Sequence, residues 1–289
     1  MIQINPRAPL FVFGGPYSNL RALAAAFTAA RDLGVPKTNI ICTGDVVAYA
    51  AEPEESVRLI READITVIAG NCEQQLGEGA DDCGCGFEEG TICDRLAKGW
   101  YSFANARLSS ASRAWMRQLP SSIRFTYSGR TFLVVHGGVK QVNRFIFRSD
   151  VAVLAEELTR ADADVVIAGH SGIPFVATIG TQLWFNAGVV GMPANDGTPD
   201  GWYGLVLPDA DEAGLSFALR RLRYRAQAAA DALREVDPSS PYADTLVSGR
   251  WPSLDVLPPV ERSQTGQPIV ETIVRYCQSG TRQAARLSA

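Results

Sequence analysis

The stretch Ile40-Ile41-Cys42-Thr43-Gly44-Asp45 decides how the rest of the chain is interpreted. It is a short apolar run closed by glycine and aspartate, which is typical of a buried strand that ends in a turn. In open α/β sheets, ligands bind beyond the carboxyl ends of the strands. We therefore expect Asp45 to lie at the rim of a functional site.

Three further apolar runs also lead to a metal-capable side chain, and these side chains are Asn71, His136 and His170. The two histidines are the only ones in the chain. Two imidazoles, an amide oxygen and the carboxylate of Asp45 suit Mn²⁺, Fe²⁺ or Zn²⁺. The four residues together predict one metal centre. The alternative for each residue alone is a turn residue or a satisfied polar group.

Composition and charge exclude some classes of protein. The chain has 289 residues, of which 46% are hydrophobic and 20% charged, as in ordinary globular proteins. With a net charge of -4 and no basic stripe, a nucleic-acid partner is not expected. Residues 1–9 lack the features of a signal peptide, and no apolar run approaches the ~18 residues of a membrane span. We expect a cytoplasmic protein, and a homo-oligomer remains open.

The first 70 residues alternate between strand and helix patterns. Strands are expected at 9–13, 40–45 and 65–71, with helices between them at about 19–32 and 53–63. This alternation predicts a parallel sheet.

The glycine-rich stretch 76–90 interrupts this rhythm and predicts a long loop over the site, because so much glycine disfavours a helix. Beyond it the patterns predict helices at 91–100, 109–118 and 151–158, and a hairpin at 123–135. Strands follow at 165–168, 175–179, 183–186, 202–207 and 215–219, and then a helix at 226–236. The two groups of strands predict two packed sheets flanked by helices. The remainder of the chain is weakly patterned.

The motifs Gly44-Asp45, Gly70-Asn71, His136-Gly137 and Gly169-His170, in this order, resemble the calcineurin-like metallophosphoesterases. The nearest branch resembles the small bacterial YfcE-like and diadenosine-tetraphosphatase-like phosphodiesterases, since Asn186–Pro193 echoes a signature of that branch. The resemblance implies a four-layer αββα sandwich over residues 1–223, with a cysteine-containing insertion at about 76–95. A helical or irregular C-terminal extension would then occupy residues 224–289.

Three departures from the family pattern concern one half of its two-metal site. Gly15 and Tyr17 stand where the family has an Asp-x-His pair, and Gly172 replaces the second histidine of Gly-His-x-His. In the family these three positions ligate the first metal. The resemblance therefore implies one divalent transition metal, held by Asp45, Asn71, His136 and His170, and makes a second metal unexpected.

The resemblance also suggests roles for residues around the metal. Asp45 and His136 are the expected catalytic residues together with Tyr17, which either offers a phenolic donor or fills the vacated metal position. Asn19, Arg144 and Arg148 are the expected substrate-binding residues, although the two arginines can equally be solvated loop charges.

The cysteines Cys72, Cys83, Cys85 and Cys93 gather around the glycine-rich stretch. They can bind Zn²⁺, form a redox-labile disulfide or remain unpaired thiols. Two functions follow from the whole pattern. The first is a metal-dependent phosphoesterase with a one-metal or remodelled site, acting on a phosphorylated small molecule. The alternative is a catalytically inactive member of the family that binds a phosphorylated ligand or a protein partner.

Overall fold

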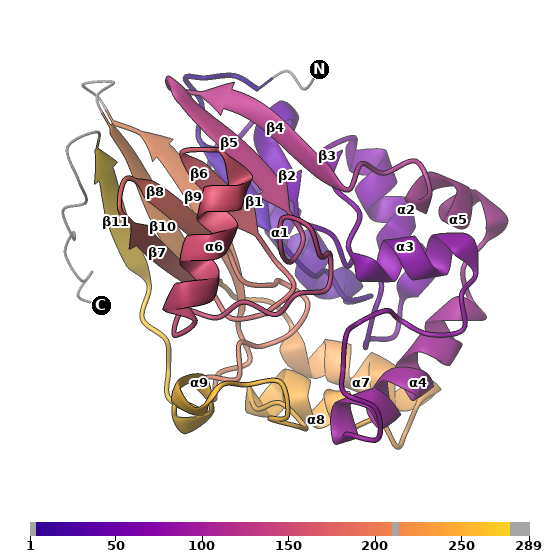
Figure 1. The fold of residues 1–289 in the computed structure, drawn as a ribbon. Helices are drawn as coiled ribbons and strands as arrows, with labels where there is room; N and C mark the ends of the chain where they lie inside the picture. Colours follow the sequence, from indigo (N-terminus) through magenta and orange to yellow (C-terminus); the bar gives the residue numbers. More distant parts are fainter. Residues whose placement is uncertain (1–3, 210–213, 278–289) are drawn as a thin grey trace.

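The computed structural model describes residues 4–209 and 214–277, which form two mixed β-sheets between layers of helix (Figure 1). The larger sheet contains six strands in the order β11 (Thr272–Cys277), β10 (Gly214–Leu222), β9 (Gly201–Pro208), β1 (Leu10–Phe13), β2 (Ile40–Cys42) and β3 (Thr66–Val67). The strands β1, β2 and β3 are parallel to one another, as the alternation at the start of the chain predicts. The other pairings in this sheet are antiparallel.

The smaller sheet contains five strands in the order β4 (Ser122–Tyr127), β5 (Arg130–Val135), β6 (Val165–Ala168), β8 (Gln182–Asn186) and β7 (Phe175–Ile179). The strands β5, β6 and β8 are parallel, and an antiparallel hairpin partner closes each side. The carboxyl ends of β5 and β6 therefore open at one edge, which is where the two histidines follow.

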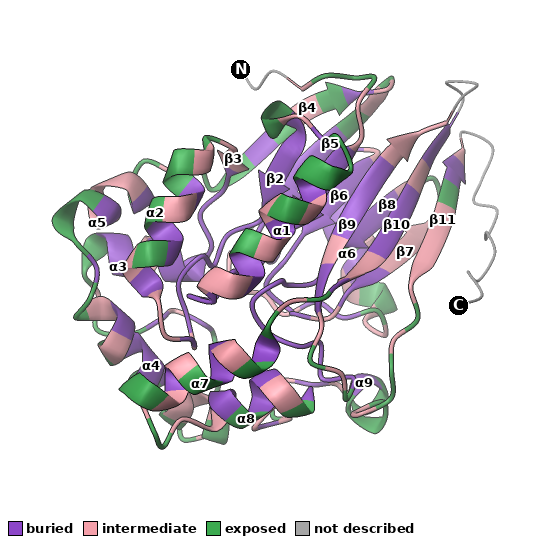
Figure 2. Cartoon of the chain, turned by 180° about the vertical axis from the view of Figure 1, so that it is seen from behind, coloured by how far each residue is buried: buried purple, intermediate pink, exposed green. Residues whose placement is uncertain are grey.

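Alternating side chains explain why the two sheets stack. Leu10 and Val12 of β1 point into a core that both sheets share, and Phe132 and Val134 of β5 enter it from the other side. The residues between them point outward, where they pack against helices. The expected four-layer αββα sandwich is confirmed, and Figure 2 shows the buried strands between helices whose outer surfaces are exposed.

The helices lie on the outer faces and at one end of the sandwich (Figure 1). The first layer holds α1 (Leu20–Asp32) and α2 (Pro53–Ala63), and α6 (Val151–Ala161) covers the smaller sheet. The others are α3 (Asn71–Glu78), α4 (Ile92–Asn105), α5 (Ser110–Met116), α7 (Ala226–Val236), α8 (Pro241–Ser248) and α9 (Pro259–Ser263), with a short 3₁₀ turn at Lys37–Asn39. None of the helices in the described ranges is long and apolar enough to cross a lipid bilayer.

Two local expectations were wrong. Asn71 does not end a strand, because β3 stops at Val67 and Asn71 begins α3. The predicted loop at 76–90 also starts too early, since residues 76–78 form the last turn of α3. Leu76 is fully buried there, and its packing outweighs the glycines around it.

The C-terminal segment contains more regular structure than its weak pattern suggests. The helices α8 and α9 follow α7, and β11 pairs with β10 along the edge of the larger sheet. The domain boundary near residue 223 remains a prediction, although β11 belongs to the sheet that the preceding residues build. Residues 278–289 of the expected extension lie outside the described residues.

Candidate metal centre

Three of the four predicted metal ligands follow the ends of strands, and the fourth begins a helix. Asp45 lies beyond β2, His136 directly follows β5, His170 lies beyond β6, and Asn71 is the first residue of α3. All four side chains are buried. Gly70 allows the close approach, because a Cβ atom at that position would lie 2.3 Å from Asp45 Oδ1.

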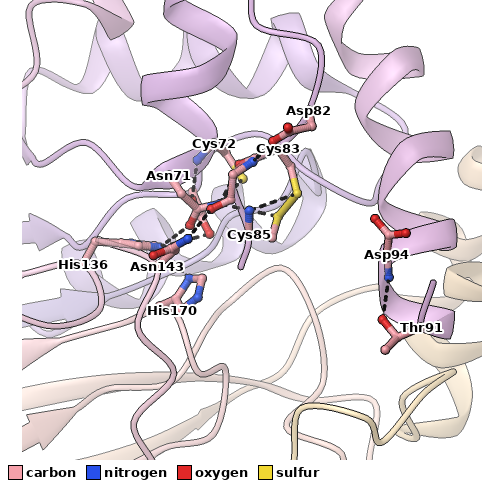
Figure 3. The surroundings of a disulfide bond; sticks show 12 residues. Asn71, Cys72, Asp82, Cys83, Cys85, Thr91, Asp94, His136, Asn143 and His170 are labelled. Atoms are coloured by element: carbon pink, nitrogen blue, oxygen red, sulfur yellow. Dashed lines mark hydrogen bonds and ion pairs between the residues drawn. A yellow bond between two sulfur atoms is a disulfide. The ribbon is translucent and has the colours of Figure 1, made fainter. Parts of the chain in front are cut away.

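The side chains converge on the Nε2 atom of His136, and Figure 3 shows Asn71 and His170 beside it. Asn71 Oδ1 and His170 Nδ1 each lie 3.1 Å from this nitrogen, and Asp45 Oδ2 lies 3.2 Å from it. Asp45, His136 and His170 each offer one ligand atom, and these atoms lie within 4.8 Å of one another. The predicted quartet is therefore one cluster.

Neighbouring groups fix the orientation of two of these side chains. His136 Nδ1 is 2.6 Å from the carbonyl oxygen of Thr43, so it carries the proton and leaves the lone pair on Nε2. The Asn71 amide donates from Nδ2 to the carbonyl oxygen of Cys83 at 2.9 Å, which turns Oδ1 toward His136. The Nε2 atom of His136, the Oδ1 atom of Asn71 and a carboxylate oxygen of Asp45 thus face one another.

A divalent cation fits between these converging polar atoms. Adjacent ligands of a six-coordinate ion with bonds of about 2.1 Å lie about 3 Å apart, which matches the separations around His136 Nε2. Imidazole nitrogens with a carboxylate and an amide oxygen are also a donor set that suits transition metals.

Burial and the charges within the cluster shift the pKa values of its titratable side chains. Burial alone lowers the pKa of His136, but the Asp45 carboxylate, the Thr43 carbonyl and the Glu73 charge together outweigh burial, and the pKa is raised above its usual value. Burial raises and His136 lowers the pKa of Asp45, and the result is a lowered value. Burial, with the neighbouring His136, lowers the pKa of His170 to about 3. His170 is therefore neutral at physiological pH, as a metal ligand must be.

Two residues of the cluster have a strained backbone. Asp45 has φ of 54° and His170 has φ of 60°, in the left-handed region that non-glycine residues rarely adopt. Such conformations cost about 1–3 kcal/mol each and persist where the surrounding structure holds them. The fold therefore bears a cost to aim these two side chains inward.

Glu73, for which the sequence motifs predicted no role, stabilises the backbone next to the cluster. Its buried carboxylate accepts hydrogen bonds from the backbone N–H groups of Asp45 at 2.7 Å, Val46 at 2.8 Å and Gly70 at 2.9 Å. The signal was available, because a glutamate three residues after Gly70 fits the capping pattern of a helix start. Burial raises the pKa of Glu73 to about 7, and the Asp45 charge adds to the rise.

Aromatic rings lie beside Gly15 and Gly172, two of the positions at which the resemblance leads us to expect ligands of a first metal. A Cβ atom at Gly15 would lie 2.5 Å from Cζ of Tyr17, so the Tyr17 ring fills the space beside that glycine. A Cβ atom at Gly172 would lie 3.1 Å from the ring of Trp251, which comes from the C-terminal segment. Both rings line a cavity of about 80 Å³ that His170 borders.

Two of the predicted substrate-binding residues bind groups outside this cluster, and the third is exposed. Asn19 caps α1, where its Oδ1 accepts from Ala22 N at 3.1 Å and its Nδ2 donates to Gly191 O at 2.9 Å. Arg144 turns toward α6, where it pairs with the buried Glu157 at 2.6 Å and with Glu156. Arg148 is exposed. Their roles in substrate binding remain predictions.

The cysteines divide into two groups. Cys83 and Cys85 form a disulfide beside Asn71, whereas Cys72 and Cys93 are free thiols. Within the described ranges, the one cluster of histidine, cysteine and acidic side chains that could hold a metal consists of Asp45, His136 and His170, without a cysteine. The glycine-rich loop thus lies beside the metal centre, as its position after Asn71 predicts.

Comparisons with solved structures agree with the fold. A metallophosphoesterase from Sphaerobacter thermophilus matches with a TM-score of 0.65 and 22% identity over 84% of this chain and 99% of that one. The hypothetical protein PH1004 from Pyrococcus horikoshii OT3 matches with a TM-score of 0.70 and 17% identity over 83% of this chain and 98% of that one.

Sequence comparisons identify the family. The uncharacterized protein MJ0912 of Methanocaldococcus jannaschii is 25% identical over 186 residues, which are 64% of this chain and 70% of that protein. Residues 18–209 match the domain described as the calcineurin-like phosphoesterase superfamily domain. This span contains the four residues of the cluster, all five strands of the smaller sheet and the strands β2, β3 and β9 of the larger one, so the resemblance drawn from the motifs is confirmed at this level. The chain belongs to the calcineurin-like phosphoesterase superfamily.

Proposed function

We propose that this protein is a phosphoesterase with a single divalent metal, which hydrolyses a phosphorylated small molecule. The observation that carries the proposal is the buried cluster in which Asp45, Asn71 and His170 surround Nε2 of His136 at 3.1–3.2 Å. Mn²⁺, Fe²⁺ or Zn²⁺ suits these donors. At the positions where the resemblance leads us to expect ligands of a first metal, in contrast, this chain has Gly15, Tyr17 and Gly172.

The residues of the centre have distinct tasks in this proposal. When bound, the metal supplies Lewis-acid polarisation of a phosphoryl oxygen and lowers the pKa of a coordinated water. Asp45 supplies the negative ligand, and His136 is held in one tautomer by Thr43. Tyr17 keeps its proton at neutral pH, because burial and then the Asp45 charge raise its pKa well above the usual value. Its hydroxyl is therefore a donor and not a base.

The proposal is tested by metal analysis combined with hydrolysis assays. Purified protein, incubated with Mn²⁺ and then desalted, should carry one ion per chain and hydrolyse bis(p-nitrophenyl) phosphate or p-nitrophenyl phosphate slowly. His136→Ala should lose both metal and turnover. Tyr17→Phe is the matched variant, since it keeps the ring and should keep the metal while turnover falls. Two tightly bound ions per chain, or turnover that survives His136→Ala, would contradict the proposal.

A second candidate function is binding without catalysis. The packing of Tyr17 beside Gly15 and of Trp251 over Gly172 favours it, because these rings leave little room for a second ion and its ligands. An inactive protein would bind inorganic phosphate or a phosphomonoester in the metal-loaded form, with no hydrolysis above background. Calorimetric binding of phosphate together with zero turnover would select this function.

A further inference from the structure

The loop between α3 and α4 is tied to the metal centre through one side chain. Asn71 Nδ2 donates to the carbonyl oxygen of Cys83 at 2.9 Å and lies 3.4 Å from Sγ of Cys85 (Figure 3). The opposite end of the same amide, Oδ1, lies 3.1 Å from His136 Nε2. The Asn71 amide thus connects the disulfide loop with the metal cluster.

The disulfide sets the conformation of this part of the loop. Cys83 and Cys85 enclose a single glycine, and Cys85 N donates back to Cys83 Sγ at 3.2 Å. Asn143 Nδ2 holds the carbonyl oxygen of Gly84 at 3.0 Å from the other side. Residues 79–91 contain no helix or strand. If the disulfide is broken, no regular secondary structure keeps the Cys83 carbonyl in place.

The disulfide is buried, but exposed residues flank it on both sides. Cys83 and Cys85 are each 5% exposed, while Asp82 and Gly86 on either side of them are exposed. A small reductant therefore reaches the sulfur atoms after local opening of the loop, which unfolds no helix or strand.

We propose that the Cys83–Cys85 disulfide is a redox-controlled clasp that positions the metal ligand Asn71, so that its reduction by a dithiol weakens metal binding. The proposal rests on the metal centre of the proposed function. In the step itself, the S–S bond accepts two electrons and two protons from the dithiol. Two cysteine thiols form, and the reductant leaves as its own disulfide. Cys83 and Cys85 are positioning residues, since they act through Asn71.

The expected effect follows from the role of groups that orient a ligand. Loss of such a group typically weakens metal affinity 10–100-fold. Since the reduced loop still leaves Asn71 in place on α3, we expect the lower end, about a 10-fold weaker affinity. The thermal midpoint of the metal-free protein should change little, because the loop contributes few core side chains.

The experiment titrates Mn²⁺ alone into the full chain and measures the dissociation constant by calorimetry. One sample is oxidised, and the other is reduced with a dithiol and desalted under anaerobic conditions. Mn²⁺ is the metal used, because it prefers oxygen ligands over thiols. The reduced protein should bind about 10-fold more weakly. Cys83→Ser with Cys85→Ser should bind as weakly in both conditions. Cys93→Ser is the matched control and should keep the difference.

Asn71→Asp gives the sharpest test of the connection. The carboxylate keeps a ligand oxygen but has no N–H to donate to Cys83, so metal binding should remain and its dependence on the reductant should disappear. Equal affinity of the oxidised and reduced native protein overturns the clasp alone. Tighter binding after reduction also overturns it, since a cysteine sulfur would then be a ligand. Absence of Mn²⁺ binding in both states overturns the metal centre and the clasp together.

Discussion

Replacement of Glu73 by alanine tests whether the backbone behind the metal centre depends on one buried carboxylate. The substitution removes the acceptor of three backbone N–H groups, those of Asp45, Val46 and Gly70. Each buried donor left unsatisfied costs about 1–3 kcal/mol, and a simple sum gives about 3–9 kcal/mol. Water entering the vacated space offsets part of this, so we expect a loss of about 3–5 kcal/mol in the free energy of unfolding.

The assay is urea unfolding of the metal-free protein followed by circular dichroism, so that metal affinity does not enter the result. Glu73→Gln should lose about 2 kcal/mol, because the amide keeps one acceptor oxygen but turns a donor toward a backbone N–H. Glu78→Ala is the matched control on the same helix, since Glu78 is exposed and its loss should change stability by no more than about 0.5 kcal/mol. A Glu73→Ala protein within about 1 kcal/mol of the native protein would refute the reasoning.

Three further predictions concern the site itself. Metal affinity should rise with pH from about 6 to 8, because the raised pKa of His136 means that a proton competes for Nε2 at lower pH. Calorimetry in buffers of different ionisation enthalpy should detect the release of this proton. A metal affinity that does not change with pH would contradict the direction of the pKa shift. Gly15→Asp alone should lower the thermal midpoint, since its side chain meets the Tyr17 ring and the backbone there has φ of 42°. Adding Tyr17→His should restore part of the loss. Equal midpoints of the single and the double variant would show that the ring does not fill this space. Arg144→Ala should destabilise the protein by about 1–3 kcal/mol, because the buried Glu157 carboxylate then loses one of its two arginine partners and keeps only Arg160. Arg148→Ala should leave stability unchanged but raise KM if it binds substrate; the reverse order of stabilities would contradict the ion pair.

The metal centre could be predicted from sequence because its signals are local. A buried parallel strand reads as an apolar run, and a polar residue just after it must lie at the carboxyl edge of the sheet. This reasoning holds for Asp45, His136 and His170, which the structure brings together. It holds less well for Asn71, where the ligand position was right but the element was a helix.

The surroundings of the centre could not be predicted because they depend on contacts between distant segments. Nothing near Gly172 in the sequence indicates that Trp251 packs over it, and no local pattern sends Arg144 to Glu157. The strand β11 was missed as well, since its Thr272–Cys277 run is short and its pairing with β10 supplies most of what defines it. Tertiary packing of this kind overrides local propensity.

The late position of Trp251 and β11 in the chain has a consequence for synthesis on the ribosome. Chains emerge from the N-terminus, so residues 45–170, with all four proposed metal ligands, are available before the segment that closes the cavity and the sheet edge. During that interval the centre lacks its Trp251 wall, and β10 exposes an unpaired edge. The nascent protein therefore offers its metal ligands to the surrounding solution in a more open form than the finished protein does. Metal supplied during translation should accordingly be incorporated faster than metal added after folding is complete.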